Sequence, residues 1–123
     1  MKLLGNLLWL VFGGLFIALE YFIASLLLMI TIIGIPFGLQ TMKLAELALW
    51  PFGKNIETHE KSSGLSTLMN LIWILIGGVW ISLSHILIGI LLGITIVGIP
   101  FAKQHFKLAS LALTPFGKTI SEA

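Results

Sequence analysis

The sequence predicts an all-α integral membrane protein of two tandem repeats, each a short transmembrane hairpin (or broken helix) followed by an amphipathic interfacial helix. Composition is the first reason, because 58% of the 123 residues are hydrophobic, only 10% are charged, and the mean hydropathy is +1.08. The second reason is the length of the apolar runs. Residues 3–39 contain only Glu20 and Tyr21 as ionisable side chains, and residues 65–102 contain only His85. Both runs exceed the roughly 18 apolar residues that indicate a membrane-spanning helix.

An internal repeat is the third reason. A shift of 64 residues aligns the segment from Thr31 to Phe37 with that from Thr95 to Phe101, both reading Thr-Ile-x-Gly-Ile-Pro-Phe. About half of the aligned positions are identical, and matching Gly and Pro residues indicate a duplicated structural unit. We expect one unit at residues 1–54, a second at residues 67–123, and a solvated linker at residues 55–66, which is polar and contains Gly64.

Each apolar block allows three geometries. One helix over residues 3–35 would be about 50 Å long, against about 30 Å of hydrocarbon, and would bury Glu20 near the bilayer centre. A hairpin that turns at Glu20–Tyr21, and at Ser84–His85 in the second copy, avoids both problems. It also puts all seven lysines on one side, which the positive-inside rule makes cytoplasmic together with both termini. A third geometry breaks the block at Gly13–Gly14 and leaves residues 15–33 as one span. The hairpin is favoured, although its turn lacks Gly, Pro and Asn.

The Gly-Ile-Pro sequence should end the spanning helix in each repeat. Proline lacks a backbone donor and disfavours helix at the preceding residue, but it suits the first turn of a new helix. The break is therefore expected at Gly34 and Pro36, and at Gly98 and Pro100, with new helices reaching about Leu49 and about Leu113.

A polar stripe follows each break. It consists of Gln40, Lys43 and Glu46 in the first repeat and of Gln104, Lys107 and Ser110 in the second. A helix with a narrow polar stripe is typical of the membrane interface, where its lysines reach lipid phosphates. Alternatively, the stripes of several subunits line a pore, because broken helices at membrane depth are tolerated beside a water-filled cavity.

Few other residues suggest chemistry. Glu20 and His85 are candidate intramembrane polar residues, and an interhelical or headgroup hydrogen bond is the expected role of His85. The spacing of His and acidic residues fits no metal site, and no catalytic motif is visible, so we expect no cofactor, no metal and no enzyme activity. Because the lysines are scattered among apolar segments, nucleic acid is not an expected partner.

The motifs together resemble a known family. Each copy has Trp-x3-Gly-Gly at the start, the Gly-Ile-Pro break, and Lys-Leu-Ala-x-Leu-Ala-Leu-x-Pro-Phe-Gly-Lys at the end. This combination is similar to the YccF family of bacterial inner membrane proteins, also described as an inner membrane component domain, over nearly the whole chain. The resemblance implies a multi-pass protein of the bacterial inner membrane. It implies no activity and no binding residues.

These observations lead to two functional hypotheses. A chain this small encloses little interior, so transport would require a homo-oligomer with walls shared between subunits. The first hypothesis is an oligomeric channel or transporter for an ion or small solute, with membrane lipids and further copies of the chain as partners. The alternative is a non-transporting membrane scaffold or lipid-binding component.

Overall fold

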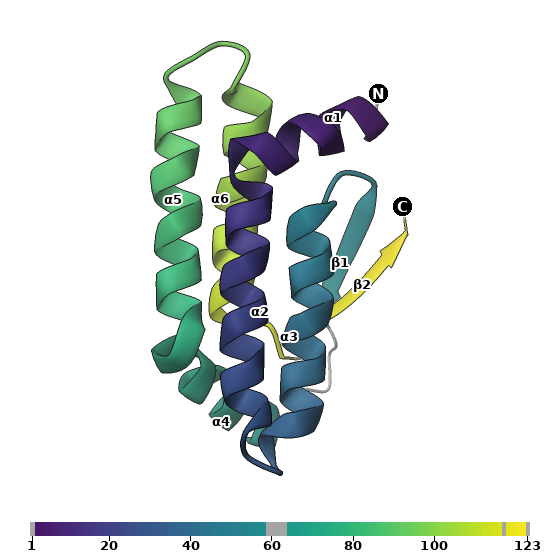
Figure 1. The fold of residues 1–123 in the computed structure, drawn as a ribbon, viewed down its shortest axis with the longest axis vertical. Coiled ribbons are helices and arrows are strands. Elements are labelled where there is room, and N and C mark those ends of the chain that lie inside the picture. The colour runs from purple at the N-terminus through teal and green to yellow at the C-terminus, as the bar shows by residue number, and fades with distance from the viewer. Residues whose placement is uncertain (1, 59–63, 117, 123) are drawn as a thin grey trace.

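The computed structural model describes residues 2–58, 64–116 and 118–122 and shows a mostly helical molecule (Figure 1). The first repeat contains α1 (Lys2–Trp9), a π-helical segment η1 (Leu10–Gly14), α2 (Leu15–Met29), α3 (Gly34–Leu49) and strand β1 (Lys54–Thr58). The second contains α4 (Gly64–Trp73), η2 (Ile74–Gly78), α5 (Val79–Gly93), α6 (Ile99–Leu113) and strand β2 (Lys118–Glu122). The order of elements is the same in both, so the repeat in the sequence is a repeat in structure.

The main unit of each repeat is an antiparallel helical hairpin, α2 with α3 and α5 with α6 (Figure 1). The turn between α2 and α3 is fixed by Thr31, whose Oγ1 donates to the Leu28 carbonyl and accepts from the Gly34 N–H, both at 3.0 Å. Thr95 makes the same two bonds in the second repeat. A new helix therefore begins near each Gly-Ile-Pro sequence and ends at Leu49 or Leu113 as predicted, but the preceding helices end earlier than predicted, at Met29 and Gly93.

The predicted turn at Glu20–Tyr21 is wrong, and so is its equivalent at Ser84–His85. Both pairs lie inside continuous helices, α2 and α5. The first apolar block instead kinks at Gly13–Gly14, as in the third geometry, and the second passes through the π-helical segment η2 at Gly77–Gly78. The physical reason is that nothing at Glu20–Tyr21 disfavours helix, whereas Gly13 adopts a φ of 119° that other residues rarely tolerate. The second arm of each hairpin comes from the segment after the Gly-Ile-Pro break, which packs lengthwise on the first arm.

A short sheet departs from the all-α prediction. Strands β1 and β2 form an antiparallel pair in which Ile56 lies opposite Ile120, and both side chains pack against the hydrophobic core. Residues 55–58 of the predicted linker thus belong to a strand, while its His59, Glu60 and Lys61 lie outside the described residues. Ile56 and Ile120 are also equivalent under the shift of 64, so a pseudo-two-fold axis passes through the centre of this sheet.

The two repeats are related by this pseudo-two-fold axis throughout the core. The Trp9 Nε1–H donates to the Ala48 carbonyl at 2.6 Å, and the Trp73 Nε1–H donates to the Ala112 carbonyl at 2.8 Å. The two hairpins point in opposite directions, with the turn after α2 at one end of the molecule and the turn after α5 at the other (Figure 1). The repeats are consequently inverted along the long axis.

The exposed charged side chains of the helices described here lie on α3 and α6, which also expose apolar residues such as Leu39 and Phe106. The exposed large side chains of α2 and α5 are all apolar, and they include Leu19 and Leu87. The exposed side chains of α3 and α6 include Lys43, Glu46 and Lys107, and the β1–β2 sheet adds further polar residues beside α3 (Figure 1). Among the described residues, the helical stretches Leu3–Met29 and Thr67–Gly93, each of 27 residues, are long and apolar enough to cross a membrane.

Candidate functional site

Glu20 and Ser84 meet where α2 crosses α5. The Ser84 Oγ–H donates to Glu20 Oε2 at 2.9 Å, and the same oxygen of Ser84 lies 3.1 Å from the Trp80 carbonyl. The two residues are equivalent under the shift of 64, so their contact lies on the pseudo-two-fold axis. The other carboxylate oxygen, Glu20 Oε1, is buried and has no hydrogen-bond partner among the described residues. A buried carboxylate oxygen without a donor is costly, and such residues inside membrane helices usually mark functional sites.

Glu20 is among the residues that line a pocket of about 190 Å³. Apart from Glu20, its lining is apolar and comes from α2, η2 and α5: Ile23, Ala24, Leu27, Ile76, Gly77, Trp80 and Ile81. Gly77 allows the close helix approach that shapes the pocket, because a Cβ at this position would lie 2.7 Å from the Ala24 Cβ. Glu20 is therefore the acidic residue in the lining of a small, otherwise apolar pocket between the repeats.

His85 and His105 form a second buried polar cluster, and both are fully buried. Their Nδ1 atoms lie 2.9 Å apart, and His105 Nε2 lies 2.9 Å from the Phe12 carbonyl oxygen. Because a carbonyl only accepts, His105 carries its proton on Nε2, and His85 must then donate from Nδ1. His85 Nε2 is left as an acceptor with no partner among the described residues. The interhelical hydrogen bond expected for His85 is thus present.

The cluster has a different composition in the other repeat. Tyr21 and Thr41 are the equivalents of His85 and His105. Tyr21 stacks on Trp73 at a ring-centroid distance of 6.0 Å, and Thr41 hydrogen-bonds to Ser25. His105 was not predicted as a site residue from the sequence, because it lies between two residues of the α6 stripe. The signal that could have identified it as buried is its spacing of four residues from Phe101, which is also buried.

The polar-stripe residues do not converge on one site. Gln40 Nε2 donates to the Pro115 and Lys118 carbonyls at 3.3 and 2.9 Å, so its amide joins α3 to the end of the second repeat. Gln104 is half-buried, whereas the remaining stripe residues, Lys43, Glu46, Lys107 and Ser110, are exposed on α3 and α6.

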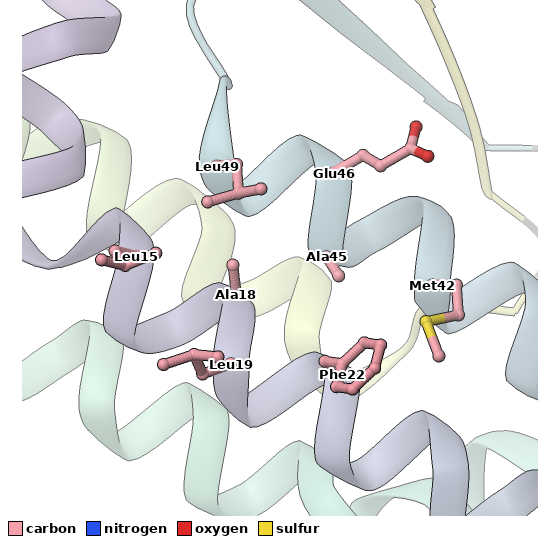
Figure 2. A pocket seen from close by; sticks show the side chains of 8 residues that line it. All are labelled: Leu15, Ala18, Leu19, Phe22, Met42, Ala45, Glu46 and Leu49. Atoms are coloured by element: carbon pink, nitrogen blue, oxygen red, sulfur yellow. The ribbon is translucent and has the colours of Figure 1, made fainter.

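A larger pocket of about 330 Å³ lies between α2 and α3 (Figure 2). Its lining consists of Leu15, Ala18, Leu19, Phe22, Met42, Ala45, Glu46 and Leu49. The side chain of Glu46 extends from its rim with the carboxylate directed away from Ala18 and Leu19 (Figure 2). This pocket is an apolar groove on the outside of the first hairpin. No three His, Asp or Glu residues gather as a possible metal site in the described part of the chain.

Comparisons with known proteins identify the family. The family model described as inner membrane component domain, YccF, matches residues 4–54 and again residues 68–118. The chain is 30% identical over 129 aligned positions to the Inner membrane protein YccF of Escherichia coli (strain K12), an alignment that covers 98% of this chain and 87% of that protein. The Shigella flexneri protein of the same name matches equally well. No solved structure matches the chain significantly. The chain belongs to the YccF family of inner membrane component domains.

Proposed function

We propose that the protein is a multi-pass inner membrane protein that assembles into a homo-oligomer and passes an ion or small solute. The observation that supports this proposal is a difference between the two pairs of helices: the exposed large side chains of α2 and α5 are all apolar, whereas α3 and α6 also expose Lys43, Glu46 and Lys107. In a bilayer, the apolar side suits lipid, but exposed Lys43 and Lys107 need water or a partner.

A homo-oligomer meets both requirements. Copies arranged with α2 and α5 outward present apolar surface to lipid, and their α3 and α6 stripes then border a shared polar path. The inverted orientation of the two hairpins also supports this proposal. Many transporters consist of inverted repeats whose two-fold axis lies in the membrane plane, with the substrate site near the repeat interface.

The charge of the two stripe lysines provides the test. If Lys43 and Lys107 border the path, their positive potential concentrates anions, so the double variant Lys43→Glu/Lys107→Glu should shift ion preference toward cations. Reversal potentials in planar bilayers or proteoliposomes with a salt gradient measure the preference. The double variant with Arg at both positions keeps the charge and should retain wild-type preference. Unchanged reversal potentials in the Glu variant would rule out the path at these residues.

The alternative function is a lipid-binding scaffold, and two observations favour it specifically. The 27-residue helical stretches include the π-helical segments η1 and η2, and α2 and α5 by themselves have 15 residues each, about 22 Å, which is short for a crossing of about 30 Å. The groove of about 330 Å³ beside Leu19 and Phe22 also offers apolar surface to an acyl chain. In this case the stripe lysines contact headgroups, and their replacement by Glu should weaken binding to anionic vesicles, by about 1 kcal/mol per lysine, with no change in flux.

A further inference from the structure

We propose that the buried His85–His105 pair is a proton-sensitive switch for the kink in η1. In the neutral pair, His105 holds the Phe12 carbonyl and keeps η1 kinked. When both rings are protonated, the pair separates and the carbonyl is released. The pair connects α5 and α6 of the second repeat with η1 of the first. This switch acts on the conformation of η1, so it goes beyond the proposed path and does not depend on it.

η1 and η2 occupy equivalent positions but differ in backbone conformation. Phe12 (φ −87°, ψ 24°) and Gly13 (φ 119°, ψ −15°) lie outside the helical region. Gly77, the equivalent of Gly13, has no positive φ. Because the sequence has a glycine pair at both positions, glycine alone does not explain the kink, and another contact must favour it in η1.

His105 makes that contact. Its Nε2–H donates to the Phe12 carbonyl at 2.9 Å, at the first non-helical residue of η1. A Cβ on Gly13 would lie 3.1 Å from His105 Cε1, so the histidine ring lies directly against the kink. The indole of Trp9 stacks on the same ring at a centroid distance of 4.0 Å and limits its freedom. The kinked backbone is therefore packed around the His105 ring.

Thr41, the equivalent of His105 in the first repeat, bonds differently. Its hydroxyl donates to the Gly38 carbonyl at 3.0 Å and also hydrogen-bonds to the Ser25 hydroxyl. Both partners belong to the α2–α3 hairpin, so the threonine side chain is engaged within its own hairpin and not with η2. The difference between Thr41 and His105 thus matches the difference between η2 and η1.

The neutral pair has one arrangement of protons. The Phe12 carbonyl requires a proton on His105 Nε2, so His105 Nδ1 accepts the Nδ1–H of His85. The remaining lone pair, on His85 Nε2, is buried and has no partner among the described residues. An added proton must go to this nitrogen, where it creates a buried charge and an N–H without an acceptor. The kinked arrangement therefore opposes protonation.

A second proton is incompatible with the pair. Both Nδ1 atoms would then carry hydrogens that face each other across 2.9 Å, and neither could accept. The rings must separate, and because Nδ1 and Nε2 belong to one rigid ring, His105 cannot turn from His85 without moving Nε2 away from the Phe12 carbonyl. The loss of this bond removes the contact that distinguishes η1 from η2, so Gly13 should lose its positive φ.

Other titratable side chains on the elements around the pair face elsewhere. On α2, Glu20 accepts a hydrogen bond from Ser84, and Tyr21 stacks on Trp73. α1 carries only Lys2, at its first residue, and η1 carries no titratable residue. The charged side chains of α3 and α6 are exposed: Lys43, Glu46, Lys103 and Lys107. The two histidines are thus the titratable groups at the kink.

The test is NMR spectroscopy of the full chain in nanodiscs, labelled with ¹³C and ¹⁵N in histidine, glycine and glutamate. The titration runs from about pH 8 to about pH 3, far below the ordinary histidine value of about 6.5, because burial opposes the charge. At about pH 8, the ring nitrogens should show His105 protonated on Nε2 and His85 on Nδ1. On acidification, the Gly13 signals should shift toward helical values with the midpoint of ring protonation, while the Gly77 signals stay in place.

Matched variants separate the pair from general effects of acid. His105→Gln keeps an N–H donor for the Phe12 carbonyl but does not titrate, so Gly13 should keep its signal over the whole range. His105→Thr copies the first repeat and should shift the Gly13 signal already at about pH 8. His59→Gln removes the third histidine of the sequence, which lies outside the described residues, and should respond like wild type.

Wild type alone can overturn the proposal, even if a variant fails to fold. The proposal is wrong if Gly13 keeps its signal after both rings are protonated, or if the rings stay neutral down to about pH 3. It is also wrong if Gly77 shifts together with Gly13, as in general unfolding. A Gly13 midpoint that follows the Glu20 carboxyl signal instead of the ring signals would overturn it as well.

Discussion

At the scale of single residues, polar side chains in this apolar chain act mainly as connectors between elements. The Asn6 Nδ2 donates to the Phe52 carbonyl at 3.0 Å, and the Phe52 N–H donates back to Asn6 Oδ1 at 2.9 Å. Asn70 makes the same pair of bonds with Phe116. Each asparagine thus attaches the first helix of its repeat to the segment that follows the last helix of the same repeat, 46 residues later in the sequence. The side chain satisfies two backbone groups that no regular element pairs.

Replacing Asn6 by Leu should therefore destabilise the fold. The substitution keeps a similar volume but leaves the Phe52 N–H and carbonyl without partners, at about 1–3 kcal/mol for each buried group. Thermal unfolding in mild detergent, followed by circular dichroism, should show a decrease of several degrees, given roughly 4 °C per kcal/mol for a chain of this size. Asn70→Leu should give a comparable decrease. A stability equal to wild type in both variants would mean that water replaces the asparagine amide at no cost.

At the scale of elements, the reliable sequence signals were the residues that constrain the backbone. The Gly-Ile-Pro breaks and both helices that follow were predicted, because Pro36 and Pro100 restrict the chain whatever surrounds them. The position of the hairpin turn was missed, because α2 and α3 are both apolar and only tertiary packing shows which segments pair. The strands were missed for a similar reason: four of the residues 54–58 are polar, and the pairing partner of this strand lies 60 or more residues away in the sequence.

The site was predictable to a lesser extent. Glu20 stood out because an acid in an apolar run is unusual, and the structure brings it to the repeat interface. Its partner Ser84 and the pocket could not be derived, since both depend on how α2 crosses α5. The polar stripes were visible as a pattern, but the bonds of Gln40 to Pro115 and Lys118 show that one of these residues connects the repeats.

The turn between α5 and α6 allows a test at this scale. A Cβ on Gly98 would lie 2.2 Å from the Leu92 carbonyl oxygen, a backbone atom that cannot move away without opening the turn. Gly98→Ala should consequently lower the free energy of unfolding by about 3 kcal/mol or more, which places it among strongly destabilising substitutions. Gly93→Ala is the matched control, because its Cβ would meet only the Ala102 Cβ at an ordinary 3.6 Å. Chemical denaturation of both variants measures the difference, and equal stability of the two would contradict the expected clash.

At the scale of the whole molecule, the pseudo-two-fold axis links structure to function. It passes through the Glu20–Ser84 contact and through the Ile56–Ile120 pair, and it relates hairpins that point in opposite directions. If the axis lies in the membrane plane, the hairpins run across the bilayer as inverted repeats, as the proposed path requires. If the axis lies along the membrane normal, the hairpins lie along the surface with α2 and α5 in lipid, as a lipid-binding scaffold requires.

The two orientations differ in where they place the hairpin tips, which are the turn after α2 and the turn after α5. Ile32 and Ile96 occupy equivalent positions in the two tips and are each 86% exposed. The chain contains no cysteine, so Ile32→Cys and Ile96→Cys each introduce a unique thiol. If the protein is the proposed oligomeric path, a membrane-impermeant maleimide added to spheroplasts should label one tip, and in inverted vesicles it should label the other. Leu19→Cys, on the apolar face of α2, should remain unlabelled in both preparations.

The labelling pattern follows from where each tip would lie. Hairpins that run across the bilayer bring the tips to opposite surfaces, because the turn after α2 and the turn after α5 are at opposite ends of the molecule. Hairpins that lie along the surface keep both tips at one depth, so the reagent should react with both thiols to the same extent in either preparation. Since the two-fold axis makes the tips equivalent in the second case, equal labelling would exclude inverted repeats across the membrane. It would favour the lipid-binding scaffold, with the stripe lysines at the headgroups.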